Sequence, residues 1–321
     1  MVGYDDQLKE LSPTQYALAG AVSGITTRLL LQPLDVVKIR LQLQVDPLKQ
    51  IRSEQYRRKY RGLLQSLSRI ASEEGLLALW KGHIPAQLLS VSYGCVQFMS
   101  FEVLTKLAYQ IISPEKYLDQ KPITHFICGG LSGCCSSVVV QPIDVLRTRL
   151  VAQGEPKVYV SLLHAVREMF NENGIRTFYK GLLPTMLEIF PQTGMHFAFY
   201  TGLQMIWNNH MKSLVDGNIS VSESLFCGAM SGILSKIIIH PLDVVKKRLQ
   251  VEGFAIKEVA IPGPNDNMKS PSMLNCIWNI LKKEGMRGFY KGLKVNIIKG
   301  ASSAGLSFMS YEQCCKYLMN Y

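Results

Sequence analysis

The sequence lacks the motifs on which most enzymes depend. It has no G-x-G-x-x-G or Walker loop for a nucleotide phosphate, and its six histidines are scattered without an H-x-x-x-H pair. None of its eight cysteines forms a C-x-x-C pair, so we expect them to be packing residues and not metal ligands. We therefore expect neither an enzyme nor a bound metal or cofactor.

Negative charge is also scarce, because 24 Asp and Glu stand against 35 Lys and Arg, for a formal net charge of +11. Such an excess suits a nucleic acid, an anionic lipid or an anionic solute as the partner. The basic residues form no long segment interleaved with aromatics, so we do not expect nucleic acid. The mean hydropathy of +0.10 leaves the membrane question open on composition alone.

Three copies of one block decide what composition leaves open. They read QPLDVVKIRLQ, QPIDVLRTRL and HPLDVVKKRLQ, and each is followed by a second block, EGLLALWKG, NGIRTFYKG or EGMRGFYKG. The second glycine of a G-x-x-x-G precedes each proline at one fixed distance. This order, kept three times, predicts three homologous units over residues 12–112, 122–212 and 221–321.

Each unit contains two long, largely apolar segments. Residues 83–101, 122–143 and 189–211 carry no Asp, Glu, Lys or Arg and are long enough to span a bilayer as helices. The first segment of each unit is interrupted by proline and ends in charges, which fits a helix with one face on water. The stretch GLLQSLSRIASEEG predicts a short amphipathic helix lying at the membrane interface, with a soluble surface helix as the alternative.

Six spans place both termini on one side of the membrane. The loops that carry the W/Y-K-G blocks hold most of the loop Lys and Arg, so we expect these loops on the matrix-like side.

These motifs resemble the mitochondrial carrier family over essentially the whole chain. The three P-x-D-x-x-K/R-x-R blocks and the three aromatic-K-G blocks carry the resemblance. It implies an all-α membrane protein, with six transmembrane helices in a threefold pseudosymmetric barrel and three short amphipathic helices on the matrix side. It also implies alternating-access exchange of solutes across the mitochondrial inner membrane, with both termini toward the intermembrane space. One chain supplies a complete ring, so we expect a monomer.

The resemblance further implies a matrix gate, in which the Asp of one repeat pairs with the base of the next. The pairs expected here are Asp35 with Arg147, Asp144 with Lys246, and Asp243 with Lys38. Gln42 and Gln250 occupy the brace positions, whereas the second repeat has Val151 there. Losing one partner of a buried pair leaves an uncompensated charge, so we expect such a ring to fix the register of the helices relative to one another.

The opposite, cytoplasmic gate is matched less well. Its positions are Phe101, Glu102, Tyr200, Tyr311 and Glu312, and no base stands at the family's distance from them. We therefore expect no full ionic ring there, and a cytoplasm-facing state in the absence of substrate.

Charged residues inside spans mark the expected substrate site. Arg28 and Lys236 each precede the repeat proline by the same distance. The resemblance implies substrate contacts at Leu89, Glu188, Ile189 and Lys299, and the neighbouring polar side chains suited to a ring are Gln87, Tyr93, Gln192 and His196. Helix packing is the alternative role for Tyr93 and His196.

Three convergent bases suit a pyrophosphate, because charge-assisted bonds strengthen in a cavity of low dielectric. Glu188 suits a cationic group such as a thiazolium, or else an internal salt bridge with Lys299 or Arg28. The site predicts thiamine pyrophosphate or a related thiamine phosphate as the transported solute, and it also permits a nucleotide or another phosphorylated coenzyme. An uncoupler or scaffold that moves no organic solute is the alternative of another class.

Cardiolipin is the expected lipid partner. Free backbone N–H groups at a helix start attract phosphate, and the resemblance places such sites at the aromatic-K-G blocks. The residues concerned are Lys81, Gly82, Lys180, Gly181, Lys291 and Gly292, with Gly62 as the one surviving glycine of the matching motif at the amphipathic helices.

Overall fold

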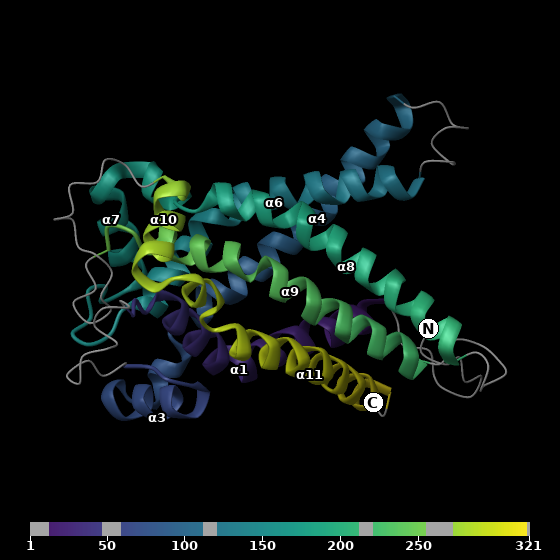
Figure 1. Ribbon diagram of the computed structural model, residues 1–321. Helices are drawn as coiled ribbons and strands as arrows, with labels where there is room; N and C mark the ends of the chain where they lie inside the picture. Colours follow the sequence, from purple (N-terminus) through teal and green to yellow (C-terminus); the bar gives the residue numbers. More distant parts are fainter. Residues whose placement is uncertain (1–12, 47–58, 112–120, 212–220, 255–271, 320–321) are drawn as a thin grey trace.

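Six long helices form the body of the molecule (Figure 1). The computed structural model describes residues 13–46, 59–111, 121–211, 221–254 and 272–319, and these ranges contain no strand. Each long helix has 27 to 32 residues, or about 40–48 Å at 1.5 Å per residue, enough to cross a bilayer. They are α1 (Pro13–Leu43), α4 (His83–Ile111), α6 (Lys121–Ala152), α8 (Leu182–Met211), α9 (Val221–Val251) and α11 (Leu293–Met319). The repeat prolines lie inside α1, α6 and α9, which continue through them.

Three short helices gather at one end of the molecule, which we call the closed end (Figure 1). They are α3 (Leu63–Glu74), α7 (Leu162–Asn173) and α10 (Met273–Glu284). Each ends at a glycine with positive φ, 85° at Gly75, 59° at Gly174 and 68° at Gly285, a conformation that glycine adopts without a Cβ clash. A 3₁₀ turn then leads to the next long helix, through η1 (Leu76–Trp80), η2 (Gly174–Tyr179) and η3 (Met286–Tyr290).

The long helices pack most extensively across the boundaries between repeats. The pairs are α4 with α6, α8 with α9, and α1 with α11. Ala19 near the start of α1 is buried beside Cys315 and Tyr311 near the end of α11, so the first and last long helices close the ring. These two helix ends lie away from the closed end, at what we call the mouth (Figure 1).

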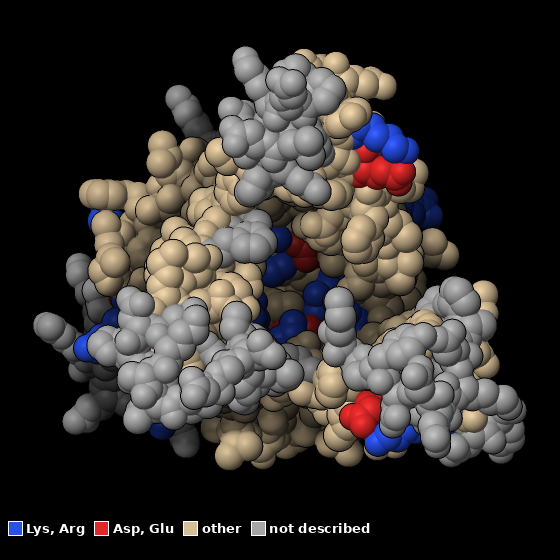
Figure 2. Space-filling view, turned by 90° about the vertical axis from the view of Figure 1, so that its right-hand side faces the viewer, with Lys and Arg blue, Asp and Glu red and all other residues tan. Residues whose placement is uncertain are grey.

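Packing is dense at the closed end and sparse at the mouth. The largest buried apolar cluster joins α1 and α6 to α3 and α7, and includes Val36, Leu43, Val145, Ile70 and Met169. A view into the mouth shows a central hollow with Lys, Arg, Asp and Glu side chains at its depth (Figure 2). The fold is therefore a barrel plugged at one end and open at the other.

The G-x-x-x-G glycines do not provide the close helix contacts that their spacing suggests. A Cβ added at Gly20, Gly24, Gly129 or Gly228 meets no atom within 4 Å, whereas one at Gly133 lies 3.0 Å from Ile189 Cγ2. Among the described residues, these four positions therefore show no close contact between helices, although small residues at this spacing would permit one. The glycines precede the repeat prolines on the mouth side, where the helices splay around the hollow.

Three stretches within the described residues are both long and apolar enough to cross a membrane. They are Leu76–Ile111, Ile123–Ala152 and Phe226–Val251. The first long helix, α1, carries Arg28, Asp35, Lys38 and Arg40, which lower its hydropathy. Those charges reach the interior of the barrel, as the ion pairs below show.

Candidate functional site

Three ion pairs join the C-terminal halves of α1, α6 and α9 in a ring. Each acid binds a base from the helix of the next repeat, as the family resemblance implied. The nitrogen-to-oxygen distances are 2.7 Å for Arg147–Asp35, 3.2 Å for Lys246–Asp144 and 2.7 Å for Lys38–Asp243. We call these six residues the inner ring, and its acids lie where the hollow meets the closed end.

Each acid of the inner ring has a further partner. Lys299 of α11 lies 2.6 Å from Asp35, and the Gln42 side chain donates to Asp243 at 3.2 Å. Gln250 donates to Asp144 at 2.8 Å, and Lys247 lies 3.0 Å from the other oxygen of the same carboxylate. Both glutamines thus reach the expected acids, while Lys247 is a functional residue that the repeated block did not single out.

The arginines that end the repeated blocks form a second ring closer to the closed end. Arg40 donates from Nε to the Val151 carbonyl and from Nη2 to the Gln153 carbonyl, at the C-terminal end of α6. The other repeats do the same: Arg149 binds the carbonyls of Gln250 and Glu252, and Arg248 binds those of Gln42 and Gln44. The last carbonyls of a helix lack partners within it and carry partial negative charge. Each of α1, α6 and α9 is therefore capped by an arginine from another repeat, and we call these contacts the outer ring.

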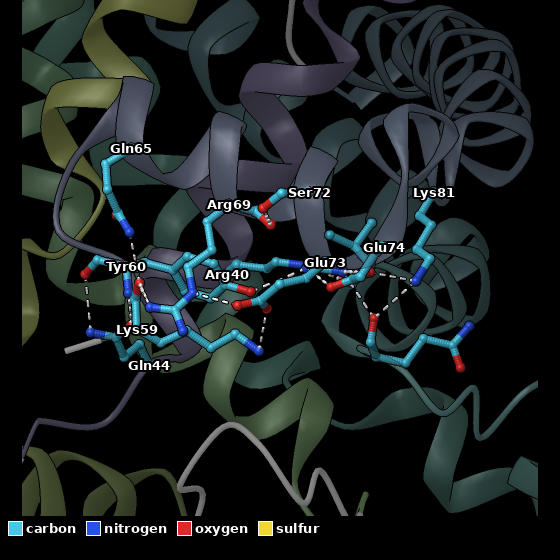
Figure 3. Close-up of polar contacts among 12 residues, drawn as sticks. Arg40, Gln44, Lys59, Tyr60, Gln65, Arg69, Ser72, Glu73, Glu74 and Lys81 are labelled. Carbon is cyan, nitrogen blue, oxygen red and sulfur yellow. Dashed lines mark hydrogen bonds and ion pairs between the residues drawn. The ribbon is translucent and has the colours of Figure 1, made fainter. Parts of the chain in front are cut away.

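A glutamate of each short helix holds the arginine in place. Figure 3 shows Glu74 between Arg40 and Lys81, with Tyr60 also on the guanidinium. Glu172 binds Arg149 and Lys180 in the second repeat, and Glu284 binds Arg248 and Lys291 in the third. Burial raises the pKa of Glu74, but its hydrogen bonds from Arg40 and Lys81 outweigh burial and hold that pKa below its usual range.

The lysines expected to contact lipid are engaged inside the protein. Lys180 donates to the Glu252 carbonyl at 2.7 Å, Lys291 donates to the Gln44 carbonyl at 2.7 Å, and Lys81 lies 2.6 Å from Glu74. Their ammonium groups therefore belong to the outer ring in this structure. A local pattern could not show this, because the turn after each lysine decides where the side chain points.

The glycines after these lysines pack tightly against the neighbouring repeat. Gly82, Gly181 and Gly292 have φ of 75°, 78° and 79°. A Cβ at Gly82 would lie 2.8 Å from Val151 Cγ2, and one at Gly181 or Gly292 would lie 3.0 or 3.2 Å from a backbone carbonyl of α9 or α1. They bring the starts of α4, α8 and α11 against α6, α9 and α1, respectively.

A surface pocket of about 280 Å³ lies between two repeats beside the first of these turns. Lys81, Glu155, Lys157, Tyr159 and Ser161 are among its lining residues. Ser161 caps α7 by accepting a hydrogen bond from the His164 amide, and Gly62 stands at the same position before α3. The helix start favours an anionic group, while Glu74 and Glu155 also line the pocket and pair with its two lysines.

The three expected substrate bases lie around Asp35. Lys299 binds that carboxylate directly. The Lys236 ammonium lies beside Gly300, the next residue of α11, and would be 2.6 Å from a Cβ added there. Arg28 donates to the Ala86 carbonyl at 2.6 Å and is within electrostatic range of Asp35. Among the described residues, no carboxylate lies within 4 Å of Arg28 or Lys236, so both bases keep their charge for a ligand.

Glu188 lies close to the inner ring and shares the electrostatic neighbours Asp243 and Lys38 with Lys236. Asp243, Lys246 and Lys38 act on it electrostatically, but no Lys or Arg of the described chain lies within 4 Å. The internal salt bridge of Glu188 with Lys299 or Arg28 is therefore absent, because Lys299 binds Asp35 instead.

The polar side chains expected to bind a ring are split between two places. A Cβ on Gly133 would lie 3.5 Å from the Tyr93 hydroxyl and 3.0 Å from Ile189, so α4, α6 and α8 meet at this point. His196 lies 3.4 Å from Ser231 on α9, one turn beyond Gln192, which is exposed. Leu89 is half-buried, one turn after the carbonyl that Arg28 binds.

The mouth has charged pairs, but each lies within a single helix. Glu102 binds Lys106 at 2.7 Å, Glu312 binds Lys316 at 2.7 Å, and Gln204 donates to the Tyr200 hydroxyl. Phe101 packs edge-on against His125 of α6, and Tyr311 lies in the cluster around Ala19. Within the described part of the chain, no ion pair crosses the mouth, and that end stays open.

A comparison with known proteins identifies what this barrel is. A family model for the mitochondrial carrier protein matches residues 9–111, 119–211 and 217–321. The chain belongs to the mitochondrial carrier family. The resemblance and the all-α fold expected from the repeats are thereby confirmed, and the chain is a multi-pass mitochondrial membrane protein. The predicted repeat bounds at residues 12, 112, 212 and 321 lie outside the described residues, and all six predicted bounds stay predictions.

Individual carriers are similar over nearly their whole length. The human mitochondrial thiamine pyrophosphate carrier is 44% identical over 98% of this chain and 96% of its own length. The Bos taurus protein of the same name is 44% identical over 99% and 97%. Mitochondrial thiamine diphosphate carrier 1 of Arabidopsis thaliana is 36% identical over 92% and 91%.

Proposed function

We propose that this carrier exchanges thiamine pyrophosphate across the mitochondrial inner membrane by alternating access, without a cofactor. Three bases, Arg28, Lys236 and Lys299, and one acid, Glu188, gathered at the inner ring carry the proposal. The names of the similar carriers support the same solute.

The charges around the inner ring match the two ends of that solute. Arg28 and Lys236 have no carboxylate within 4 Å among the described residues, so they offer uncompensated positive charge to a pyrophosphate. Glu188, likewise without an ion-pair partner there, offers a negative charge to the thiazolium. Tyr93 and Gln192 extend from the neighbouring helices and supply stacking or hydrogen bonds to the ring.

Lys299 couples this site to the inner ring. A pyrophosphate that binds Lys299 competes with Asp35 for the ammonium, and Asp35 then keeps Arg147 as its ring partner. Substrate drives the switch only through better binding to the state it favours. Reversing a strongly biased equilibrium takes about 5.5 kcal/mol of differential affinity, which several charge-assisted contacts can supply.

The proposal includes an orientation in the membrane. The closed end carries the short helices and the basic loops, so it faces the matrix, and the mouth and both termini face the intermembrane space. The inner ring is then the matrix gate. Cardiolipin occupies the pocket between Lys81 and Ser161, where it binds chiefly through backbone N–H groups and Lys157. A single chain forms the working unit.

Thermal-shift screening of the purified carrier tests the substrate directly. We expect thiamine pyrophosphate to raise the melting temperature, because a ligand that binds only the folded state stabilises it. Inorganic pyrophosphate, thiamine and ADP serve as controls, and exchange of labelled thiamine pyrophosphate in proteoliposomes follows. A shift with ADP and none with thiamine pyrophosphate would replace the proposed substrate with a nucleotide.

A further inference from the structure

The third repeat has two adjacent lysines where the other repeats have one base. Lys246 and Lys247 both contact Asp144 of α6, at 3.2 Å and 3.0 Å, one on each oxygen of the carboxylate. The residues at the place of Lys247 in the first and second repeats are Ile39 and Thr148. We call the contact between two of the helices α1, α6 and α9 a joint. The α6–α9 joint holds two lysines of α9, whereas each of the other two joints holds one base of its own helices, and the second base on Asp35, Lys299, comes from α11.

Lys247 is a buried and fully bonded cation. Its side chain is 10% exposed, and its three N–H groups meet Asp144 at 3.0 Å, Thr148 Oγ1 at 3.1 Å and Gln250 Oε1 at 2.9 Å. An ammonium has three donors, so no donor is left over. Two of the three acceptors belong to the neighbouring repeat. A buried cation inside a membrane span is expensive and depends on such partners.

The acceptors are themselves joined to one another. Thr148 donates to Gln250 Oε1 at 2.8 Å, and Gln250 donates to the second oxygen of Asp144 at 2.8 Å. Separation of α6 from α9 would break this set together, and it would leave Lys247 beside Lys246 without the carboxylate that offsets their repulsion.

We propose that Lys247 is a positioning residue that holds the α6–α9 joint shut, so that the closed end opens less readily at this joint than at the other two. The inference rests on the proposed alternation between a closed and an open end, but not on the identity of the solute. Lys247 binds no substrate in this scheme and acts through Asp144.

Hydrogen–deuterium exchange of the purified, substrate-free carrier tests the role. In Lys247→Thr, which installs the residue of the second repeat, we expect amides at the C-terminal ends of α6 and α9 to exchange about tenfold faster. We also expect amides of α4 and α11 near the mouth to exchange more slowly, because opening one end of the barrel closes the other. Lys247→Arg, which keeps the charge, should stay close to the unmodified protein.

Lys106→Thr is the matched control, because it removes a lysine from an exposed pair within one helix at the mouth. It should leave exchange at the closed end unchanged. Faster exchange at both ends in Lys247→Thr would reveal general destabilisation and overturn the inference, as would unchanged exchange at the closed end. No substrate enters this experiment, so failure of the thermal-shift test with thiamine pyrophosphate would contradict the proposed function alone.

Discussion

Glu188 provides the sharpest test of whether the carrier binds thiamine pyrophosphate or another phosphate. It is the one acid of the expected substrate set, and it has no ion-pair partner within 4 Å in the described chain. In Glu188→Gln we expect affinity for thiamine pyrophosphate to fall about tenfold or more, since a charge-assisted contact contributes about 1.5–3 kcal/mol. Affinity for inorganic pyrophosphate should hold or rise. Calorimetry with both ligands measures this difference, with Glu102→Gln at the mouth as the control, and an equal loss for both would remove the cationic-group role.

Lys299 and Lys236, which lies beside Gly300 in the helix of Lys299, differ in partner, and this difference predicts different effects on the empty carrier. Lys299 binds Asp35 at 2.6 Å, while no carboxylate lies within 4 Å of Lys236 among the described residues. Lys299→Met should lower the melting temperature without ligand, because a buried acid loses one of its partners at a cost of about 1–3 kcal/mol. Lys236→Met should leave it nearly unchanged, yet both variants should weaken the response to pyrophosphate. Equal losses in the empty protein would contradict the link between Lys299 and the inner ring.

At the scale of helices, the glycines just before α4, α8 and α11 determine how closely neighbouring repeats pack. Gly82 has φ of 75°, and an added Cβ would lie 2.8 Å from Val151, whereas Gly75 has φ of 85° and open space around it. Gly75→Ala therefore bears only the backbone strain of about 1 kcal/mol, while Gly82→Ala adds a steric clash of about 1–3 kcal/mol. The melting temperature should be highest for the unmodified protein, lower for Gly75→Ala and lowest for Gly82→Ala. Equal melting temperatures for the two variants would disprove the tight contact.

Glu74 of the short helix α3 makes the outer ring sensitive to acid. The pKa of Glu74 in the folded protein is below its unfolded value of about 4.3. Its contribution to stability is therefore complete above the unfolded pKa and is lost as the pH falls through the folded pKa. We expect Glu74→Gln to melt below the unmodified protein at pH 7 and the difference to shrink below about pH 4. Melting curves between pH 3 and pH 7 measure it, and a constant difference across that range would exclude the ionised carboxylate as the cause.

Much of this architecture was predictable, because the signals involved are local. An acid and a base three residues apart, as Asp35 and Lys38 are, share one face of a helix. The resemblance to the mitochondrial carrier family then implied that Asp35 pairs with Arg147. The glycine of each E-G or N-G block likewise marks a helix end. Lys247 escaped prediction, since only the rotation of α9 against α6 turns it toward Asp144 instead of lipid. The inward direction of Lys81 depends on a turn whose path the sequence pattern does not reveal.

For the whole molecule, the interactions that close the closed end are stronger than those available to close the mouth. The closed end combines three ion pairs between repeats with arginine caps on three helix ends, all largely out of water. The mouth has exposed pairs within single helices, which contribute little to closure. An empty carrier should therefore spend most of its time open at the mouth, and substrate must supply the free energy that breaks the rings.

A cysteine placed in the hollow tests that bias from both sides of the membrane. Gln192 is exposed and lies one helical turn from Glu188, so a reagent that enters the mouth should reach Gln192→Cys. In oriented vesicles without substrate, we expect an impermeant maleimide to label this cysteine rapidly from the side of the termini and at least about tenfold more slowly from the other side. Saturating thiamine pyrophosphate should bring the labelling rates from the two sides closer together, because it stabilises states in which the rings open. The protein without the added cysteine corrects for native thiols, and equal labelling from both sides before substrate is added would contradict a carrier that rests open at the mouth.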